Sequence, residues 1–143
     1  MMIVVWILFG LVGAISFLAL ARIQPNQELP ILAVGLVVAA LIYTCFAIGG
    51  GATKLWIALE AAGVRVYGLL AVLGLRYSNW WLILGWMAHL LWDIGLHIID
   101  RGAAFTPVWY AIACASFDLL IAMYAIASVQ SGIFNLREPN RES

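Results

Sequence analysis

The sequence predicts an all-α, polytopic membrane protein, folded as a compact bundle of about five transmembrane helices. Hydrophobic residues make up 66% of its 143 residues, and charged residues only 10%. A typical soluble domain is about 25% charged, so this chain has too few polar side chains to cover a soluble monomer. Its apolar residues also fall in long runs between short polar turns. A helix needs about 20 apolar residues to cross about 30 Å of hydrocarbon.

Five apolar runs meet this length. They cover about residues 2–21, 30–48, 54–75, 78–99 and 107–129. We expect them to form one transmembrane helical domain over residues 1–129, followed by a short polar C-terminal tail over 130–143. The lipid bilayer is therefore the first expected partner.

The first run carries no charged residue and ends before the polar turn 22–28. It closes with Ala19-Leu20-Ala21, which resembles a signal-peptide cleavage site. No basic residue precedes the run, however, and the run is longer than the apolar core of a signal peptide. We therefore expect a retained helix, with cleavage of this helix as the alternative.

Helix-breaking and capping residues set the limits of the later helices. Pro30 suits the first turn of the second helix, and the glycine triplet 49–51 ends that helix. The third run lies between a lysine and an arginine. The fourth begins at Ser78 and ends at the polar turn 100–102, and the fifth begins at Pro107.

Basic residues in the short loops predict the orientation in the membrane. One predicted end of the bundle has four basic residues and the other has two. The four are Arg22, Arg76, Arg137 and Arg141, and the two are Lys54 and Arg101. Cytoplasmic loops are enriched in Lys and Arg. We therefore expect a multi-pass protein of the cell membrane with a cytoplasmic C-terminus.

Ionisable side chains inside the predicted spans point to a functional site. They are Glu60, Arg65, His89, Asp93, His97 and Asp118. Each charge at mid-membrane costs about 2.5–3.5 kcal/mol on insertion scales, so such groups must be paired, neutral or beside water. We take all six as candidate ligand-binding residues.

These residues fall at matching depths on three consecutive helices. At 1.5 Å per residue, Glu60 and Asp93 lie about 9–10 Å from the external end of the bundle. Arg65, His89 and Asp118 lie about 16 Å from it by the same count. The sequence therefore predicts one polar site between the third, fourth and fifth helices.

The angular positions on each helix refine this prediction. His89, Asp93 and His97 are spaced four residues apart, so they share one stripe of the fourth helix. Glu60 and Arg65 are five residues apart and differ by about 140° around the third helix. These two side chains are therefore not expected to point in the same direction.

A divalent metal ion is one expected occupant. His89 and Asp93 form a His-x-x-x-Asp pair whose ligand atoms project together from a helix. Asp118 or Glu60 would complete three or four ligands, and a bound metal would activate water for hydrolysis. In the alternative interpretation, Asp93 only orients a neighbouring histidine by a hydrogen bond.

Each of the remaining charged residues has two interpretations. Arg65 either forms an intramembrane ion pair with Asp118 or binds a carboxylate or phosphate of a ligand. Glu60 is either a general base or proton carrier, or a partly wet carboxylate paired with Lys54 or Arg65. Together with the His-x-x-x-Asp pair, Glu60 completes the set of candidate catalytic residues, which are Glu60, His89 and Asp93.

Other features exclude several function classes. Seven basic residues balance seven acidic ones, so the chain lacks the basic surface that nucleic-acid binding requires. The cysteines, Cys45 and Cys114, lie inside apolar runs and offer no disulfide framework. We expect both to be small buried apolar groups.

Part of the sequence resembles a known family. The matching motifs between Leu73 and Ile126 are Gly74-Leu75-Arg76, Gly85-Trp86-Met87-Ala88-His89-Leu90-Leu91-Trp92-Asp93 with His97 after it, and Cys114 with Asp118. This stretch resembles a family of small, uncharacterised bacterial membrane proteins with no established activity. The resemblance implies a location in the bacterial inner membrane, and it implies that His89, Asp93, His97 and Asp118 form one site.

Three functions remain open from the sequence. In the first, the buried site binds or translocates a cation, protons or a small polar ligand. In the second, the protein is a metal-dependent or His–Asp membrane hydrolase that acts on a lipid. In the third, it is an accessory subunit whose charges pair with a membrane-complex partner. A transport role would favour a homodimer, because five helices are few for one transporter protomer.

Overall fold

The computed structural model describes residues 2–98 and 101–136, and this part of the chain is helical, with no strand. The long helices are α1 (Met2–Ile23), α2 (Glu28–Gly49), α3 (Lys54–Arg76), α4 (Asn79–Trp92) and α5 (Val108–Gln130). The short elements are η1 (Pro25–Gln27), η2 (Asp93–Ile98), η3 (Arg101–Ala104) and α6 (Ile133–Leu136). The predicted fold class, an all-α bundle, is confirmed.

The fourth span changes its helical form before it ends. α4 stops at Trp92, and the chain continues without a break into η2, which is a π-helix. A π-helix has wider turns than an α-helix and frequently occurs at functional sites. Three residues that the sequence analysis assigned to the polar turn 100–102 and to the C-terminal tail lie outside the described residues. They are Asp100, Arg137 and Arg141.

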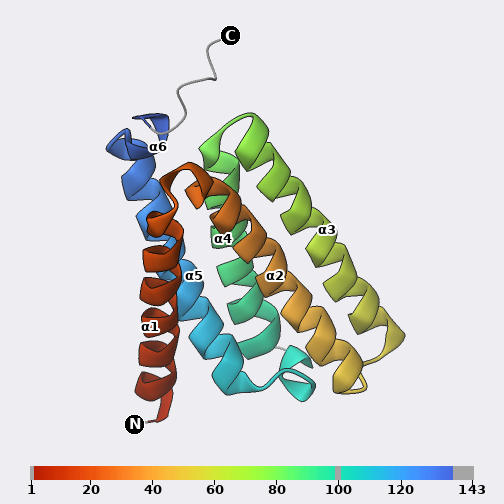
Figure 1. Cartoon of the computed structure of the whole chain (residues 1–143). Helices are drawn as coiled ribbons and strands as arrows, with labels where there is room; N and C mark the ends of the chain where they lie inside the picture. Colours follow the sequence, from red (N-terminus) through yellow and green to blue (C-terminus); the bar gives the residue numbers. More distant parts are fainter. Residues whose placement is uncertain (1, 99–100, 137–143) are drawn as a thin grey trace.

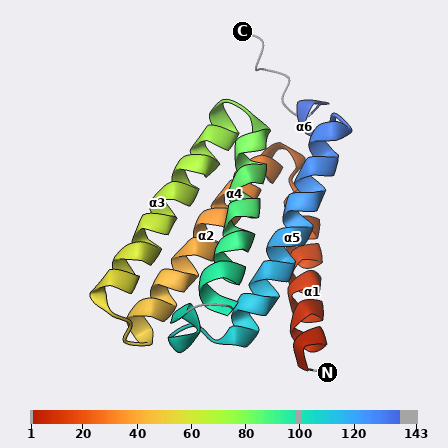
Figure 2. The same ribbon diagram turned by 180° about the vertical axis from the view of Figure 1, so that it is seen from behind.

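The five long helices form two pairs joined by α4. α2 packs along α3, α1 packs along α5, and α4 contacts both α3 and α5 (Figures 1 and 2). α1 and α2 are consecutive in sequence, yet they diverge from the turn that connects them (Figure 1). The central position of α4 allows its side chains to meet those of both neighbours.

Local sequence explains where the helices begin. The Thr53 hydroxyl accepts a hydrogen bond from the Trp56 backbone N–H at the start of α3, and Ser78 caps α4 at Trp80 in the same way. Gly51 adopts a left-handed conformation (φ 68°) in the turn between α2 and α3. That conformation is readily available to glycine and costly for other residues.

Apolar side chains lie both inside and outside the bundle. Leu32 and Leu36 of α2, Trp86 of α4 and Ile121 of α5 are buried in the core. Many large apolar side chains of α1 and α3 are exposed on the outer faces. Five helices are long and apolar enough to cross a membrane. This distribution fits a multi-pass protein whose outer surface contacts lipid.

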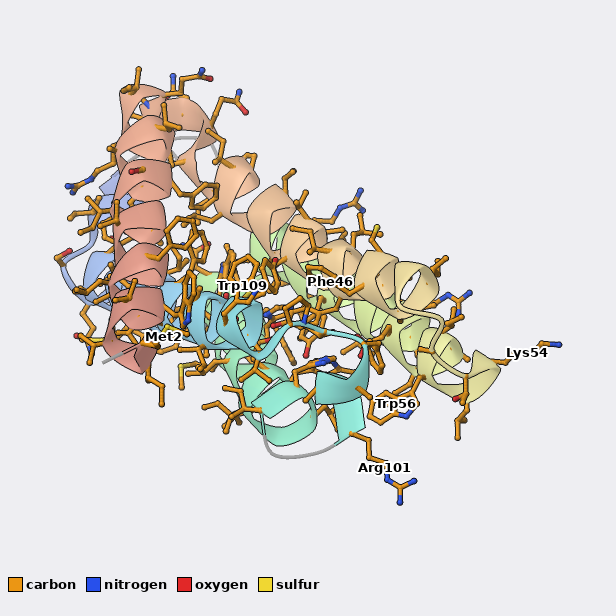
Figure 3. All side chains as sticks on the ribbon, turned by 90° about the horizontal axis from the view of Figure 1, so that it is seen from below. Met2, Phe46, Lys54, Trp56, Arg101 and Trp109 are labelled. Carbon is orange, nitrogen blue, oxygen red and sulfur yellow. The ribbon has the colours of Figure 1, made fainter. Side chains whose placement is uncertain are left out.

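The end of the bundle that carries the N-terminus also carries aromatic and basic residues. Lys54 and Arg101 point outward at this end, and Trp56 lies near them, whereas Trp109 lies closer to Met2 (Figure 3). Trp109 packs against Trp6 of α1 with ring centroids 5.3 Å apart. Tryptophans at this level are typical of a membrane–water interface.

A glycine sets the close approach of α1 to α5. A Cβ atom added to Gly10 would lie 2.0 Å from the Ala113 carbonyl oxygen and 2.1 Å from the Ser116 hydroxyl. Small residues of this kind let membrane helices pack backbone to backbone. Because the obstructing atoms include backbone, a side chain at this position must separate the helices.

Gly10→Ala is therefore expected to destabilise the bundle by about 1–3 kcal/mol, the usual cost of overpacking. Gly68→Ala on α3 is the matched control, because a Cβ atom there has nothing within 4 Å. Unfolding of both variants in detergent micelles measures the difference. Equal stability of the two variants would contradict the close packing of α1 on α5.

Candidate functional site

Four buried side chains converge between α4, η2 and α5. His89 comes from α4, Asp93 is the first residue of η2, and Cys114 and Asp118 come from α5. The spacing within each pair is four residues, which puts both members on one face of their helix. We call these four residues the His/Asp/Cys cluster.

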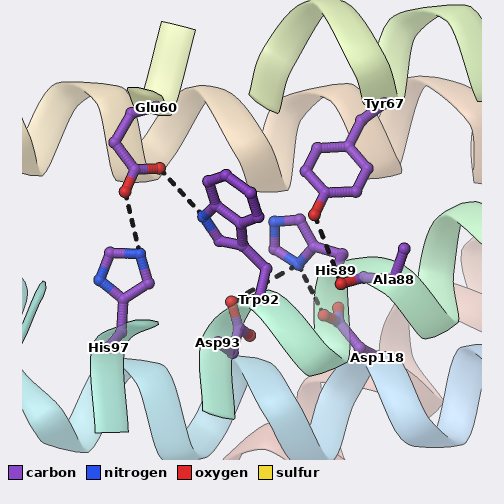
Figure 4. A network of polar contacts seen from close by, with 8 residues as sticks. All are labelled: Glu60, Tyr67, Ala88, His89, Trp92, Asp93, His97 and Asp118. Atoms are coloured by element: carbon purple, nitrogen blue, oxygen red, sulfur yellow. Dashed lines mark hydrogen bonds and ion pairs between the residues drawn. The ribbon is translucent and has the colours of Figure 1, made fainter. Parts of the chain in front are cut away.

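The ligand atoms of the His/Asp/Cys cluster lie close together. The Nδ1 atom of His89 is 2.6 Å from Oδ2 of Asp118 and 3.7 Å from Oδ1 of Asp93 (Figure 4). One ligand atom from each of the four residues lies within 4.8 Å of all the others. The exposed fraction is 0% for His89, Asp93 and Asp118, and 8% for Cys114.

Several carboxyl oxygens of the cluster accept no hydrogen bond of normal geometry, although the Tyr43 hydroxyl and the Cys114 thiol lie beside Asp93. Within the described residues, neither carboxyl oxygen of Asp93 accepts a hydrogen bond of normal geometry, and the same holds for Oδ1 of Asp118. A buried carboxylate without partners is costly in hydrocarbon. These oxygens are therefore available to a positively charged ligand inside the cluster.

A second polar group joins α3 to η2. The Nε2 atom of His97 lies 3.1 Å from Oε1 of Glu60, and the Trp92 indole N–H donates to Oε2 of Glu60 at 3.3 Å (Figure 4). Glu60 and His97 are both buried. The pair holds the end of the fourth span against α3.

Aromatic rings fill the space around both groups. The Tyr43 ring of α2 stacks on His97 with centroids 4.2 Å apart and lies 5.6 Å from His89. Tyr67 of α3 lies 5.0 Å from His89, and its hydroxyl donates to the Ala88 carbonyl oxygen at 3.4 Å. The rings limit the access of water and strengthen electrostatic interactions at His89.

The sequence analysis placed the polar side chains at two depths in the bundle, and the structure agrees with these depths in part. His89 and Asp118, expected at one depth, are hydrogen-bonded. Glu60, expected level with Asp93, instead pairs with His97, which the α-helical count places nearer the external end. The reason is η2, because a π-helix rises less per residue than an α-helix and changes the direction of His97.

Of the two interpretations of Arg65, the ion pair with Asp118 is wrong. Arg65 is exposed, and among the described residues it forms no ion pair. Glu60, on the same helix, is buried and faces α4 and η2. Five residues separate the two on α3, so when one faces the bundle the other faces outward.

Cys114 is the member of the cluster that the sequence analysis missed. We expected it to be an apolar group, but its sulfur lies among the ligand atoms of two aspartates and a histidine. The available signal was its spacing of four residues from Asp118. A thiol has no preferred partner in sequence alone, so only the packing of α4 on α5 assigns it to the cluster.

The donor set fits a transition metal. The cluster offers one imidazole nitrogen, one thiol sulfur and two carboxylates, which are ligands of Zn²⁺. In a tetrahedral zinc site with bonds of about 2.0–2.3 Å, donor atoms are roughly 3.3–3.8 Å apart. Donors already within 4.8 Å of one another need only small side-chain movements to reach that spacing.

Comparison with known proteins places the chain in a family. Residues 1–131 match the model of DUF6010, a family of unknown function. The chain belongs to DUF6010. The match includes all five long helices, and so extends beyond the stretch from Leu73 to Ile126 that carries the resemblance seen in the sequence. No curated protein and no solved structure matches this DUF6010 chain.

Two charged residues of α3 provide a direct test of this geometry. Glu60→Ala removes the partner of His97 and of the Trp92 indole N–H, and is expected to destabilise the protein by about 1–3 kcal/mol for a buried unpaired donor. Arg65→Ala, an exposed position on the same helix, is expected to change stability little. Thermal unfolding in detergent compares the two variants, and a larger loss for Arg65→Ala would refute the arrangement.

Proposed function

We propose that this DUF6010 protein binds a divalent transition-metal ion inside the membrane, with Zn²⁺ as the ion that best suits its donor atoms. The observation that supports the proposal is the His/Asp/Cys cluster itself, with four ligand atoms within 4.8 Å of one another. The function is thus cation binding by His89, Asp93, Cys114 and Asp118.

Charge balance supports a cation in this place. Asp93 and Asp118 are fully buried, and two carboxylates side by side repel each other when both are ionised. A divalent cation between them neutralises both charges and also binds the oxygens that, within the described part of the chain, accept no hydrogen bond of normal geometry. A cation therefore lowers the cost of holding both residues in hydrocarbon.

The completeness of the donor set favours binding over hydrolysis. Structural zinc sites have four protein ligands, whereas catalytic sites keep one position open for water or substrate. The cluster provides four protein ligands, and three of them have no exposed surface. We therefore place metal binding ahead of the lipid-hydrolase alternative.

The membrane location is part of the proposal. We propose a multi-pass protein of the bacterial inner membrane, supported by the five apolar helices and by the resemblance of the Leu73–Ile126 stretch. A cytoplasmic C-terminus is supported by the basic residues of the sequence. Arg22 and Arg76 lie at the ends of α1 and α3, and further arginines follow α5.

Elemental analysis of protein purified without chelators tests the proposal. Wild-type protein is expected to hold close to one zinc, or a related divalent metal, per chain. Asp93→Asn, Asp118→Asn and Cys114→Ser are each expected to lose most of it, because each removes one of four donors. Added Zn²⁺ is also expected to raise the unfolding temperature of the wild type, since a ligand that binds only the folded state stabilises it.

Glu60→Gln is the control for this experiment. Glu60 lies outside the cluster, and glutamine retains a polar side chain of similar size beside His97 and Trp92. The control is expected to keep its metal. Absence of metal from folded wild-type protein would refute the proposal, and the cluster would then be a network of residues that share protons.

A further inference from the structure

An apolar groove lies between α1 and α2, with α5 as its floor. Its volume is about 280 Å³, and its walls include Phe9 and Gly13 of α1, Val38 of α2, and Ala113 and Phe117 of α5. The groove exists because α1 and α2 diverge from their connecting turn while α1 stays packed on α5 (Figure 1).

Small residues and one aromatic ring shape the groove. Gly13 and Ala39 leave space along the two walls. Near the turn that joins the helices, the Phe17 ring lies directly on Gly35, where an added Cβ would be 2.6 Å from the ring. Val38, which lines the groove, is 46% exposed, so the groove opens to the outside of the bundle beside α2.

The floor of the groove reaches the His/Asp/Cys cluster. Cys114 and Tyr110 of α5 line the groove, and Cys114 also supplies a ligand atom to the cluster. Cys114 is the one cluster residue with exposed surface, at 8%, whereas His89, Asp93 and Asp118 have none. Cys114 is therefore the one residue of the His/Asp/Cys cluster that also lines the groove.

The surroundings of the groove identify its occupant. No charged residue lines it in the described part of the chain. Its opening is continuous with the apolar outer surface that contacts lipid, where Val12 and Val38 are 62% and 46% exposed. Water is unfavourable in an apolar cavity that offers few polar partners. The volume is roughly twice that of the ~150 Å³ apolar cavity known to accept benzene.

We propose that the groove binds an alkyl chain of a membrane lipid. The chain enters sideways from the bilayer between α1 and α2, lies on α5 and covers the exposed surface of Cys114. A second binding site of this kind goes beyond metal binding and does not depend on it. Its consequence for the cluster is that hydrocarbon, rather than water, lies beside Cys114.

A photoactivatable fatty acid with a diazirine near its terminal methyl group tests this proposal. The probe is incorporated into phosphatidylcholine vesicles that contain the full-length protein, and mass spectrometry locates the labelled residues. Labels are expected to concentrate on the groove walls of α1, α2 and α5. Val38→Trp is expected to reduce this labelling several-fold, because Val38 lines the groove and the larger side chain fills it.

Leu41→Trp is the matched control, because Leu41 is on the same helix, is 44% exposed and does not line the groove. The control is expected to label as the wild type does. Labelling spread evenly over the exposed apolar residues of all helices, or unchanged by Val38→Trp, would overturn the proposal. Metal content measured on the same samples separates the two ideas, since groove labelling without metal refutes only the metal site.

Discussion

Ionisable side chains inside a bilayer need partners, and this requirement organises the centre of the bundle. α4 and η2 carry His89, Asp93 and His97, which together are too polar to face lipid. The partners come from both neighbouring helices, Asp118 from α5 and Glu60 from α3. α4 is therefore fixed between α3 and α5 by polar contacts, while α1 and α2 are held by apolar packing together with the hydrogen bond from the Tyr124 hydroxyl to Glu28 at the start of α2.

The π-helix at the end of the fourth span follows from the same requirement. Asp93 faces α5, whereas His97, one turn later, must reach Glu60 on α3. The wider turns of η2 allow both side chains to find their partners. The irregular helix thus connects the His/Asp/Cys cluster to the Glu60–His97 pair, and the Tyr43 ring packs between them.

The sequence predicted those features that depend on helix length and helix periodicity. The five spans follow from the length of the apolar runs, and the contact of His89 with Asp118 follows from equal depth on neighbouring helices. The partner of Glu60 could not be predicted, because hydropathy does not distinguish a π-helix from an α-helix. Cys114 was missed because a thiol in an apolar run resembles any small core residue until α5 is packed on α4.

Cys114 connects the two proposed sites. Its sulfur is one of the four ligand atoms of the His/Asp/Cys cluster, and the same residue forms part of the groove floor. A lipid chain in the groove would exclude water from the thiol, and a drier environment strengthens the attraction between a cation and the two aspartates. The diverging helices α1 and α2 thus provide a lipid-facing side to a cluster that is otherwise enclosed by α2, α3 and α4.

The central claim is that a metal ion is held by one sulfur together with nitrogen and oxygen donors of this chain. X-ray absorption at the zinc edge of the loaded protein tests it most directly. One sulfur is expected at about 2.3 Å from the zinc, with the other donors at about 2.0–2.2 Å. The spectrum of Cys114→Ser is expected to lose the sulfur contribution. A spectrum of zinc coordinated by oxygen and nitrogen alone in the wild type would contradict the account.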